Sequence, residues 1–368
     1  MKAPWFFYVS LGLAAIACGK SDSAPDKNRP PAVANGRELY GQLCAQCHGK
    51  ALEGYAADHA PSLINPTFLE SVTDEYLTKS ITTGRPGTSM AAYSKQLGGP
   101  LDAASIERLV RFIRERGNVP AKQLAPIQAA GDLGRGAALY EAQCKTCHGD
   151  RTSRGEAVHL ANAMFQAQAT DPFIRHAIKA GRPGTKMLPF DKLTEQDIAD
   201  VVAFVRSFAA PAEQQPPAIA QLPPPTGKEP LVIFPGGKEP DWKPRDGRFV
   251  PVDAVMKAYE EKRKFIIIDA RPASDWMRAH ITGAVSIPYH DTNRLAEIPK
   301  DTWVIAYCAC PHHLSGEVVD ALKKLGHAKA AILDEGINDW HRKGYPMTAA
   351  QGVEKPAAEP PGHHGHSH

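Results

Sequence analysis

Cys44-Ala-Gln-Cys-His48 and Cys144-Lys-Thr-Cys-His148 are the two stretches that decide the fold of this chain of 368 residues. Each stretch holds two cysteines separated by two residues and followed directly by a histidine. On the first turn of a helix, two thiols at this spacing reach the two vinyl groups on one edge of a haem. The next histidine then lies under the iron. Two such motifs predict two covalently bound haem c groups.

Other chemistries use a cysteine pair of the same spacing, namely a redox dithiol or half of a zinc site. Both are disfavoured because each motif ends in histidine and no further pair of this spacing completes a zinc site. The chain has seven cysteines, of which the motifs use four and Cys18, Cys308 and Cys310 are the others. No cysteine is left for an ordinary disulfide between distant parts of the chain.

An internal repeat surrounds the two motifs. Gly36–Tyr40 and Gly136–Tyr140 each place a Leu-Tyr pair about one turn before the first cysteine, which is typical of a short amphipathic helix. The sequence GRPGTSM at Gly84–Met90 returns as GRPGTKM at Gly181–Met187. Each repeat ends on an apolar helical pattern, at Ile106, Leu109, Val110 and Ile113 in the first and at Ile198, Val201, Val202 and Val205 in the second.

This order of helix, C-x-x-C-H motif, methionine loop and terminal helix resembles the class I cytochromes c. The resemblance covers residues 32–118 and 132–209, with a linker over 119–131, and implies two all-α cytochrome c domains. It also implies a full set of haem ligands. These are thioether bonds at Cys44, Cys47, Cys144 and Cys147, and axial pairs of His48 with Met90 and His148 with Met187.

A methionine ligand has a physical reason, because a soft, neutral thioether favours ferrous iron and leaves no open position for a substrate. His59, His159 and His176 are other candidate ligands, but none has a counterpart in the other repeat. Arg85 and Arg182, in the methionine loops, either pair with haem propionates or are solvated loop residues.

The N-terminus predicts export. Thirteen mostly apolar residues follow the start of the chain and end just before Cys18. Ala14–Cys18 resembles a bacterial lipobox, which implies a signal peptide over 1–17, a diacylated Cys18 and a tether over 18–31. An ordinary cleaved signal and an uncleaved anchor are the alternatives. We therefore expect the chain on the periplasmic side of a bacterial cell envelope, held at a membrane by lipid.

Residues 210–247 are rich in proline and predict an extended linker, in which Leu231–Phe234 adds an edge strand to the next domain. Beyond the linker, apolar runs alternate with helical patterns, which favours an α/β domain with a central parallel sheet. The expected strands are 265–269, 303–307 and 330–333, and the expected helices are 253–262, 315–325 and a last one around Trp340.

Residues 248–348 resemble the rhodanese family. The matching pieces are IIDARPASDW (Ile267–Trp276), HITGAVSIP (His280–Pro288), a cysteine directly after a strand, and EGINDW (Glu335–Trp340). The remaining residues, 349–368, form a histidine-rich tail that either binds metal weakly or is solvated.

The resemblance places Cys308 where a rhodanese holds a thiolate or persulfide on backbone N–H groups. However, Leu314 stands where the family has an anion-binding arginine. Cys310, His312 and His313 share the loop, which suits a strained disulfide, a persulfide relay or a metal site. A binding module without activity is the alternative.

Two function classes compete. In the first, the protein carries electrons between redox partner proteins, and the rhodanese-like domain docks it or links it to sulfur metabolism. In the second, it is an enzyme that acts on a small sulfur compound at Cys308 and passes electrons to its haems. Lys and Arg number 43 against 40 Asp and Glu, a formal charge of +3 that gives no case for nucleic-acid binding.

Overall fold

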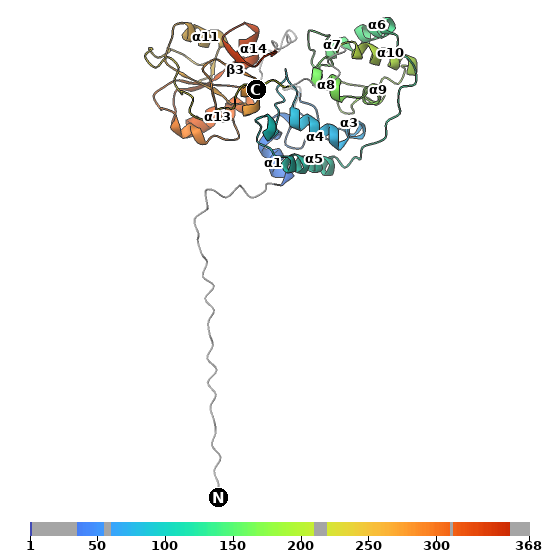
Figure 1. Cartoon of the computed structure of the whole chain (residues 1–368), viewed down its shortest axis with the longest axis horizontal. Coiled ribbons are helices and arrows are strands. Elements are labelled where there is room, and N and C mark those ends of the chain that lie inside the picture. The colour runs from blue at the N-terminus through green and yellow to red at the C-terminus, as the bar shows by residue number, and fades with distance from the viewer. Residues whose placement is uncertain (2–34, 55–59, 210–218, 310–311, 354–368) are drawn as a thin grey trace. The chain divides into compact units, whose positions relative to one another are not determined.

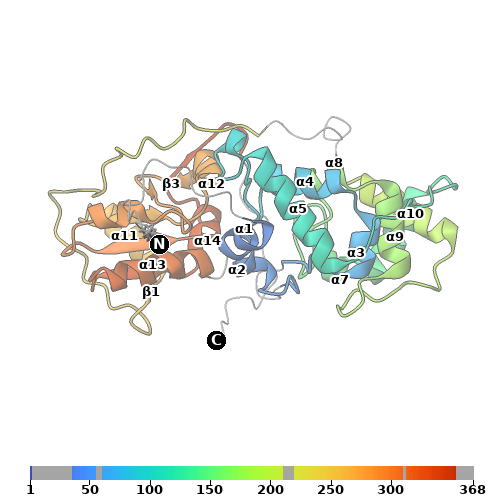
Figure 2. The ribbon, with the colours of Figure 1, turned by 90° about the horizontal axis from the view of Figure 1, so that it is seen from below.

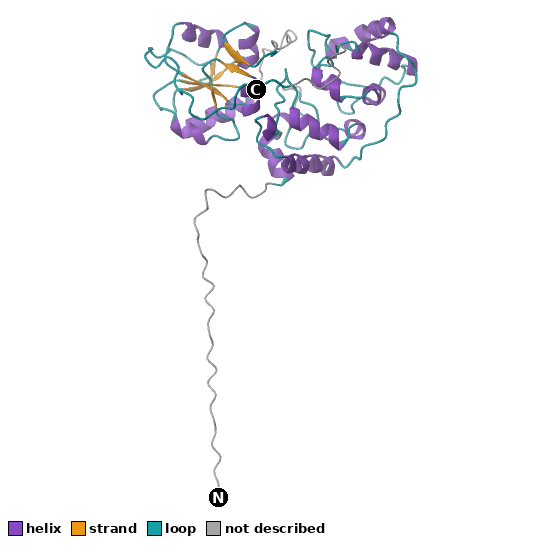
Figure 3. Cartoon of the chain, in the orientation of Figure 1, coloured by secondary structure: helices purple, strands orange, loops and turns teal. Residues whose placement is uncertain are grey.

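The computed structural model describes residues 1, 35–54, 60–209, 219–309 and 312–353 (Figure 1). Several features predicted from the sequence lie outside these residues: the signal peptide after residue 1, Cys18, the tether, His59, Cys310 and the tail from residue 354 onward. The described residues from 35 onward belong to one compact unit. Among them, all named strands lie at residue 249 or later, and residues 35–209 hold only helices and loops (Figure 3). The predicted fold class, two helical regions followed by an α/β region with a parallel sheet, is confirmed.

The two helical regions are built alike. The first contains α1 (Gly36–Leu43), α2 (Ala45–His48), α3 (Pro66–Ser71), α4 (Asp74–Thr83), the 3₁₀ turn η2 (Lys95–Leu97) and α5 (Ala103–Gly117). The second contains α6 (Leu133–Gln143), α7 (Lys145–His148), α8 (Ala163–Gln168), α9 (Asp171–Ala180) and α10 (Glu195–Arg206). The predicted terminal patterns are thus α5 and α10, and the Leu-Tyr helices are α1 and α6.

The first and last helix of each region cross closely. A Cβ atom on Gly36 would lie 2.4 Å from the backbone oxygen of Arg108 in α5, and one on Gly136 would lie 2.0 Å from that of Asp200 in α10. Only glycine permits an approach this close. The tyrosine one turn later then packs on an aromatic ring of the last helix: Tyr40 lies 5.6 Å from Phe112 between ring centroids.

The α/β region has a five-stranded parallel sheet in the order β1-β6-β5-β2-β4 and a separate antiparallel pair of β3 with β7. Its strands are β1 (Phe249–Val250), β2 (Ile266–Asp269), β3 (Ala279–Ile281), β4 (Val285–Ser286), β5 (Val304–Tyr307), β6 (Ala330–Leu333) and β7 (Met347–Ala349). Its helices are α11 (Val252–Glu260), α12 (Ala273–Arg278), the 3₁₀ turn η4 (Asn293–Glu297), α13 (His313–Lys324) and α14 (Gly336–Arg342).

Both faces of this sheet are buried. Alternate residues of β2, β5 and β6 pack with α13 in one hydrophobic cluster, and the residues between them pack with α11 and α14 in another. Figure 1 accordingly shows α11 and α13 on opposite sides of the sheet. Strands covered on both faces are continuous apolar runs, which is why the sequence shows them clearly.

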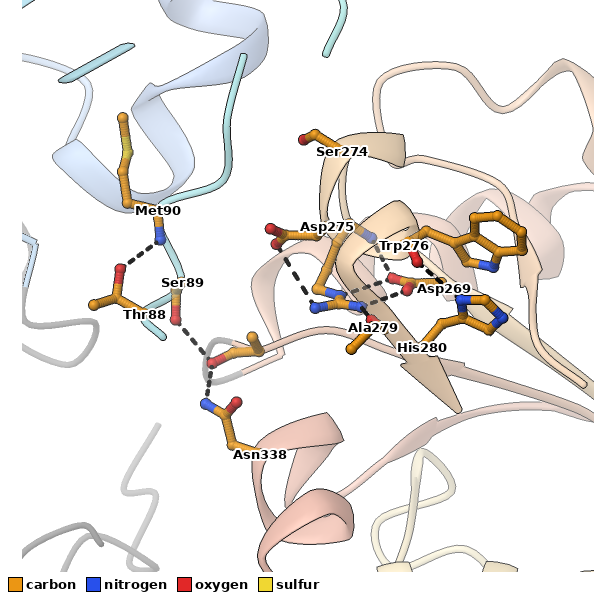
Figure 4. A network of polar contacts seen from close by, with 12 residues as sticks. Thr88, Ser89, Met90, Asp269, Ser274, Asp275, Trp276, Ala279, His280 and Asn338 are labelled. Carbon is orange, nitrogen blue, oxygen red and sulfur yellow. Dashed lines mark hydrogen bonds and ion pairs between the residues drawn. The ribbon is translucent and has the colours of Figure 1, made fainter. Parts of the chain in front are cut away.

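A buried polar network ties the sheet to the chain that follows β2. Asp269 accepts hydrogen bonds from Arg271 Nε at 2.9 Å and Nη2 at 2.6 Å, and from the Tyr307 hydroxyl at 2.8 Å. Asp275 lies 3.7 Å from the same guanidinium, which also donates to the Ala279 carbonyl (Figure 4). Burial alone would lower the pKa of Arg271, but the two carboxylates raise it above its usual range, so the guanidinium stays charged.

The linker prediction is partly wrong. Leu231–Phe234 forms no strand, since Ile233 makes a single antiparallel bridge to Phe265. Trp242 packs on Phe265 and Trp303, with ring centroids 5.1 Å and 5.6 Å away. Figure 2 shows the described part of this segment (yellow) running around the outside of the α/β region. Apolar side chains of this proline-rich segment therefore pack against the α/β region, although its composition is typical of an extended linker.

Candidate functional site

The C-x-x-C-H motifs lie at the junction of two helices in each helical region. Cys44 ends α1 and begins α2, and His48 is the last residue of α2. The His48 Nδ1 atom lies 3.0 Å from the Pro61 carbonyl oxygen, and His148 Nδ1 lies 2.8 Å from that of Val158. With Nδ1 as the donor, the ring is oriented and its lone pair lies on Nε2, the nitrogen that would bind a metal.

The two methionine loops have the same hydrogen bonds. In the first, Arg85 N donates to Met90 O at 2.7 Å, and Met90 N donates to the Thr88 hydroxyl at 3.1 Å. The equivalent bonds of Met187 in the second loop are also 2.7 Å and 3.1 Å. The sequence repeat is therefore a structural repeat at the predicted distal ligands.

The methionine loops also join the two helical regions symmetrically. Asn65 Nδ2 donates to the Pro183 carbonyl at 2.9 Å, and its counterpart Asn162 donates to that of Pro86 at 2.8 Å. Tyr76 and Phe173, at equivalent positions, stack with centroids 5.6 Å apart. Each helical region therefore donates a hydrogen bond to the methionine loop of the other region. The sequence analysis did not predict this contact, although the asparagine occurs at the same place in both repeats.

Arg85 and Arg182 lie at this junction. Arg85 Nη2 donates to the Tyr76 hydroxyl at 2.8 Å. Arg182 Nη1 donates to the Thr67 hydroxyl at 3.2 Å and lies over the Phe173 ring. Burial lowers the pKa of Arg182 to about 10. The solvated-loop alternative is therefore wrong for both residues, and pairing with haem propionates stays a prediction.

Two of the other histidines considered as ligands, His159 and His176, lie in the described part of the chain and contact other groups. His159 Nε2 lies 2.7 Å from the Asp150 carbonyl oxygen. His176 Nε2 lies 3.5 Å from Glu70 Oε2. Neither contact involves a methionine loop.

Cys308 follows β5 and is 1% exposed, with its sulfur 3.3 Å from the Ser315 hydroxyl. Helix α13 begins at His313, two residues earlier than predicted. Leu314 is 7% exposed and belongs to the hydrophobic core, so the place of the family's arginine is apolar. Within the described residues, no group of three or more His, Cys, Asp or Glu side chains could hold a metal ion.

The Cys308 loop and the first turns of α13 both contact the first helical region. The Ser89 hydroxyl donates to the Ala309 carbonyl at 2.8 Å, and Asn338 donates to the same oxygen at 3.3 Å (Figure 4). Gln46, inside the first C-x-x-C-H motif, has its carbonyl 3.0 Å from His313 Nδ1 and donates to Glu317 at 3.0 Å. The sequence analysis did not identify Ser89 and Gln46 as contact residues. The sequence does distinguish them, because the matching positions of the second repeat hold Lys186 and Thr146.

Comparison with known families agrees with this architecture. The family described as "Cytochrome C oxidase, cbb3-type, subunit III" matches residues 31–113 and again 131–205. The family described as "Rhodanese-like domain" matches residues 252–343. The chain contains cytochrome c domains in two segments, followed by a rhodanese-like domain. Both predicted families are confirmed, and cytochrome c domains bind haem c. We call the two segments cytochrome domains 1 and 2.

Individual relatives each match one part of the chain. A cytochrome bc1 complex cytochrome c subunit of Mycobacterium bovis is 26% identical over 208 residues, which are 54% of this chain and 71% of the relative. A cbb3-type cytochrome c oxidase subunit CcoP of Azospirillum sp. is 30% identical over 134 residues, 34% of this chain and 41% of the relative. The solved rhodanese-like domain of an Anabaena sp. protein is 22% identical, with a TM-score of 0.28 over 32% of this chain and 87% of that one.

None of the helices within the described ranges has both the length and the apolar character that a bilayer-spanning segment requires.

Proposed function

We propose that the protein is an electron carrier with two covalently bound haems, one in each cytochrome domain. Each haem would supply one reversible Fe(III)/Fe(II) couple. Cysteines 44 and 47 would hold the first haem and cysteines 144 and 147 the second, through thioether bonds. The axial pairs would be His48 with Met90 and His148 with Met187.

One observation carries this proposal: each repeat orients a histidine through Nδ1 and supports a methionine in a loop with the same hydrogen bonds. A histidine oriented by a backbone carbonyl is the arrangement that metal-binding histidines need. The protein therefore offers a neutral nitrogen and a neutral sulfur in each domain. That donor set suits reversible electron transfer rather than substrate binding at iron.

Haem content tests the proposal. Pyridine haemochrome spectra and intact mass should give two haems per chain in the wild type. The Cys144→Ala/Cys147→Ala variant should retain one, because domain 1 keeps its own attachment site. A matched control, Cys308→Ala, should retain both. A wild-type protein with a single haem, or a double variant with two, would contradict the proposal.

We further propose respiratory redox proteins as partners, since the relatives are named as subunits of a bc1 complex and of a cbb3-type oxidase.

The lipobox-like sequence before Cys18 supports a periplasmic position with a lipid anchor. Anchoring would come from the acyl chains. Cys18→Ser should therefore move the haem protein from the membrane fraction to the soluble periplasmic fraction. A wild-type protein that is already found in the soluble fraction would contradict the proposed lipid anchor.

A second candidate function is sulfur transfer at Cys308. It is suggested by the place of Cys308 directly after β5, with its sulfur 3.3 Å from the Ser315 hydroxyl, in a rhodanese-like domain. The transfer would take a sulfane sulfur from a persulfide donor, leaving a persulfide on Cys308 and a thiolate on the donor. No balancing oxidant is needed.

The buried sulfur and the apolar Leu314 predict weak use of thiosulfate. A cation contacting the anion would contribute roughly 1.5–3 kcal/mol, or about one to two decades in rate. We expect slow thiosulfate:cyanide transfer in the wild type, faster transfer from a persulfide donor, and neither in Cys308→Ser. Haem absorbance recorded in the same assay shows whether the donor also reduces the iron. Brisk thiosulfate transfer would show that the missing arginine is unimportant, and no transfer from either donor would favour a binding module.

A further inference from the structure

Two asparagines connect the cytochrome domains crosswise. Asn65 Nδ2 in domain 1 donates to the Pro183 carbonyl at 2.9 Å, and Asn162 Nδ2 in domain 2 donates to the Pro86 carbonyl at 2.8 Å. The asparagines occupy equivalent places, since Asn65 is the N-cap of α3 and Asn162 is the N-cap of α8. Both acceptors lie in methionine loops, so each domain contributes a side chain to the loop of the other.

The accepting carbonyls belong to tight turns. In the loop of domain 2, Thr185 N donates to the Arg182 carbonyl at 3.0 Å, and Gly184 has a φ of 80°. A proline at the second position and a positive φ at the third are typical of a type II β-turn. The turn of domain 1 has the same bond, also of 3.0 Å, and Gly87 has a φ of 82°. A Cβ atom on either glycine would meet nothing within 4 Å, so the positive φ and not crowding favours glycine here.

The asparagine binds the group whose direction defines this turn. The Pro183 carbonyl is part of the central peptide of its turn, and in a type I turn that peptide would be rotated by roughly half a turn. A donor fixed on the Pro183 oxygen therefore stabilises the type II form. Asn65 is 7% exposed, so little water reaches its side chain to replace the bond.

Further hydrogen bonds connect the turn to the methionine. Thr185 Oγ1 donates to the Arg182 carbonyl at 2.8 Å and accepts from Met187 N at 3.1 Å. Arg182 N donates to the Met187 carbonyl at 2.7 Å. A flip of the central peptide would therefore disturb the groups that hold the Met187 backbone. The same series of bonds leads from Asn162 to Met90.

The alternative is that the asparagines only cap helices. Asn65 Oδ1 accepts from Phe68 N at 3.2 Å, and Asn162 Oδ1 accepts from Phe165 N at 3.1 Å. The cap thus uses the side-chain oxygen, whereas the contact with the other domain uses the side-chain nitrogen. Serine caps a helix about as well as asparagine but has no amide group. A serine variant therefore separates the two roles.

We propose that Asn65 and Asn162 are positioning residues, each of which fixes the methionine loop of the opposite cytochrome domain. The inference rests on the proposed function, in which Met187 and Met90 bind iron. It makes the bond between methionine and iron in each domain depend on the other domain. Its consequence is a crossed pattern: a change at Asn65 weakens ligation in domain 2, and a change at Asn162 weakens ligation in domain 1.

Hydrogen exchange in the full-length holoprotein tests the positioning role at the backbone. Under conditions in which exchange reports the opening equilibrium, the amides of loop 181–187 in Asn65→Ser should exchange about two- to tenfold faster. This is the effect of losing one hydrogen bond. The amides of loop 84–90 should change less than about twofold. Asn162→Ser should show the reverse.

A third asparagine supplies the matched control. Asn35 is the N-cap of α1 in domain 1, is exposed, and accepts from Glu38 N at 3.0 Å. Asn35→Ser makes the same substitution at a cap, and exchange in either methionine loop should change less than about twofold.

Imidazole competition measures the bond between methionine and iron. Imidazole is a good ligand for iron, and its replacement of methionine on oxidised haem removes the weak far-red band of the methionine-bound form. In a Met90→Ala background, the remaining band belongs to Met187. There, Asn65→Ser should lower the imidazole concentration that removes half of the band by about two- to tenfold. Asn162→Ser should change it less than about twofold, and a Met187→Ala background should reverse the two results.

The crossed pattern decides the outcome. Effects confined to the domain that carries the substitution would support a capping role alone, and equal effects in both domains would show a general loosening of the junction. Either result, or no effect in either loop, would overturn the proposal. Haem content separates the two levels of inference. A wild-type protein with a single haem would refute the proposed function, whereas two haems without the crossed pattern would refute only the positioning role.

Discussion

Met90→Ala and Met187→Ala are each expected to remove about half of the weak far-red band, near ~695 nm, that oxidised haem shows when methionine is bound to its iron. The expectation follows from the matched loops, in which each methionine N–H donates to a threonine hydroxyl and each methionine carbonyl accepts from an arginine N–H. The reduction potential of the altered haem should fall by about 0.1–0.3 V, because a thioether favours ferrous iron.

Another methionine supplies the control. Met256→Ala lies in α11 of the rhodanese-like domain and should leave the band unchanged. The double variant Met90→Ala/Met187→Ala should lose the band altogether. A spectrum that neither single variant alters would rule out both ligands, and a full loss from one variant would leave only one methionine-ligated haem.

Asp269→Ala is expected to lower the free energy of unfolding of the rhodanese-like domain by about 3–5 kcal/mol. Asp269 is fully buried, and its carboxylate accepts from Arg271 and from the Tyr307 hydroxyl. Removing it leaves the guanidinium buried with the more distant Asp275, whose pKa burial already raises. The cost is that of an uncompensated buried cation rather than the loss of attraction alone.

The control is an exposed pair in the same domain. Glu261 lies 2.8 Å from Arg263, with side chains 40% and 35% exposed. Glu261→Ala should cost no more than about 1 kcal/mol, because water screens the pair. Urea unfolding followed by tryptophan fluorescence measures both variants, since all four tryptophans of residues 219–353 lie in or against this domain. Equal costs for the two variants would contradict the importance of burial.

The far-red band adds an internal check on locality. Asp269→Ala is expected to unfold only the rhodanese-like domain. In that case, the half of the far-red band that belongs to Met187 should survive at urea concentrations at which the tryptophan fluorescence of the rhodanese-like domain shows that it has unfolded. Loss of both signals together would show that the domains unfold as one cooperative unit.

The sequence alone determined the features that depend on residues close together in the chain. A cysteine pair and its histidine sit on one helical turn wherever the domain packs, so both motifs could be recognised. The helices α5 and α10 and the strands β2, β5 and β6 follow from apolar periodicity, because each buries its side chains on faces that the pattern itself defines.

Tertiary structure decided which surfaces meet. Trp242 packs on Phe265 from a proline-rich segment that reads as a spacer. Arg85 and Arg182 sit at the junction of the two domains, not in solvent. The loops ending at Met90 and Met187 differ at one position, Ser89 against Lys186. Within the described part of the chain, however, Ala91 after the first loop is 3% exposed and Leu188 after the second is 68% exposed. Local sequence could not show this difference, because burial of a surface depends on the partner that packs against it, and here that partner is encoded more than a hundred residues away.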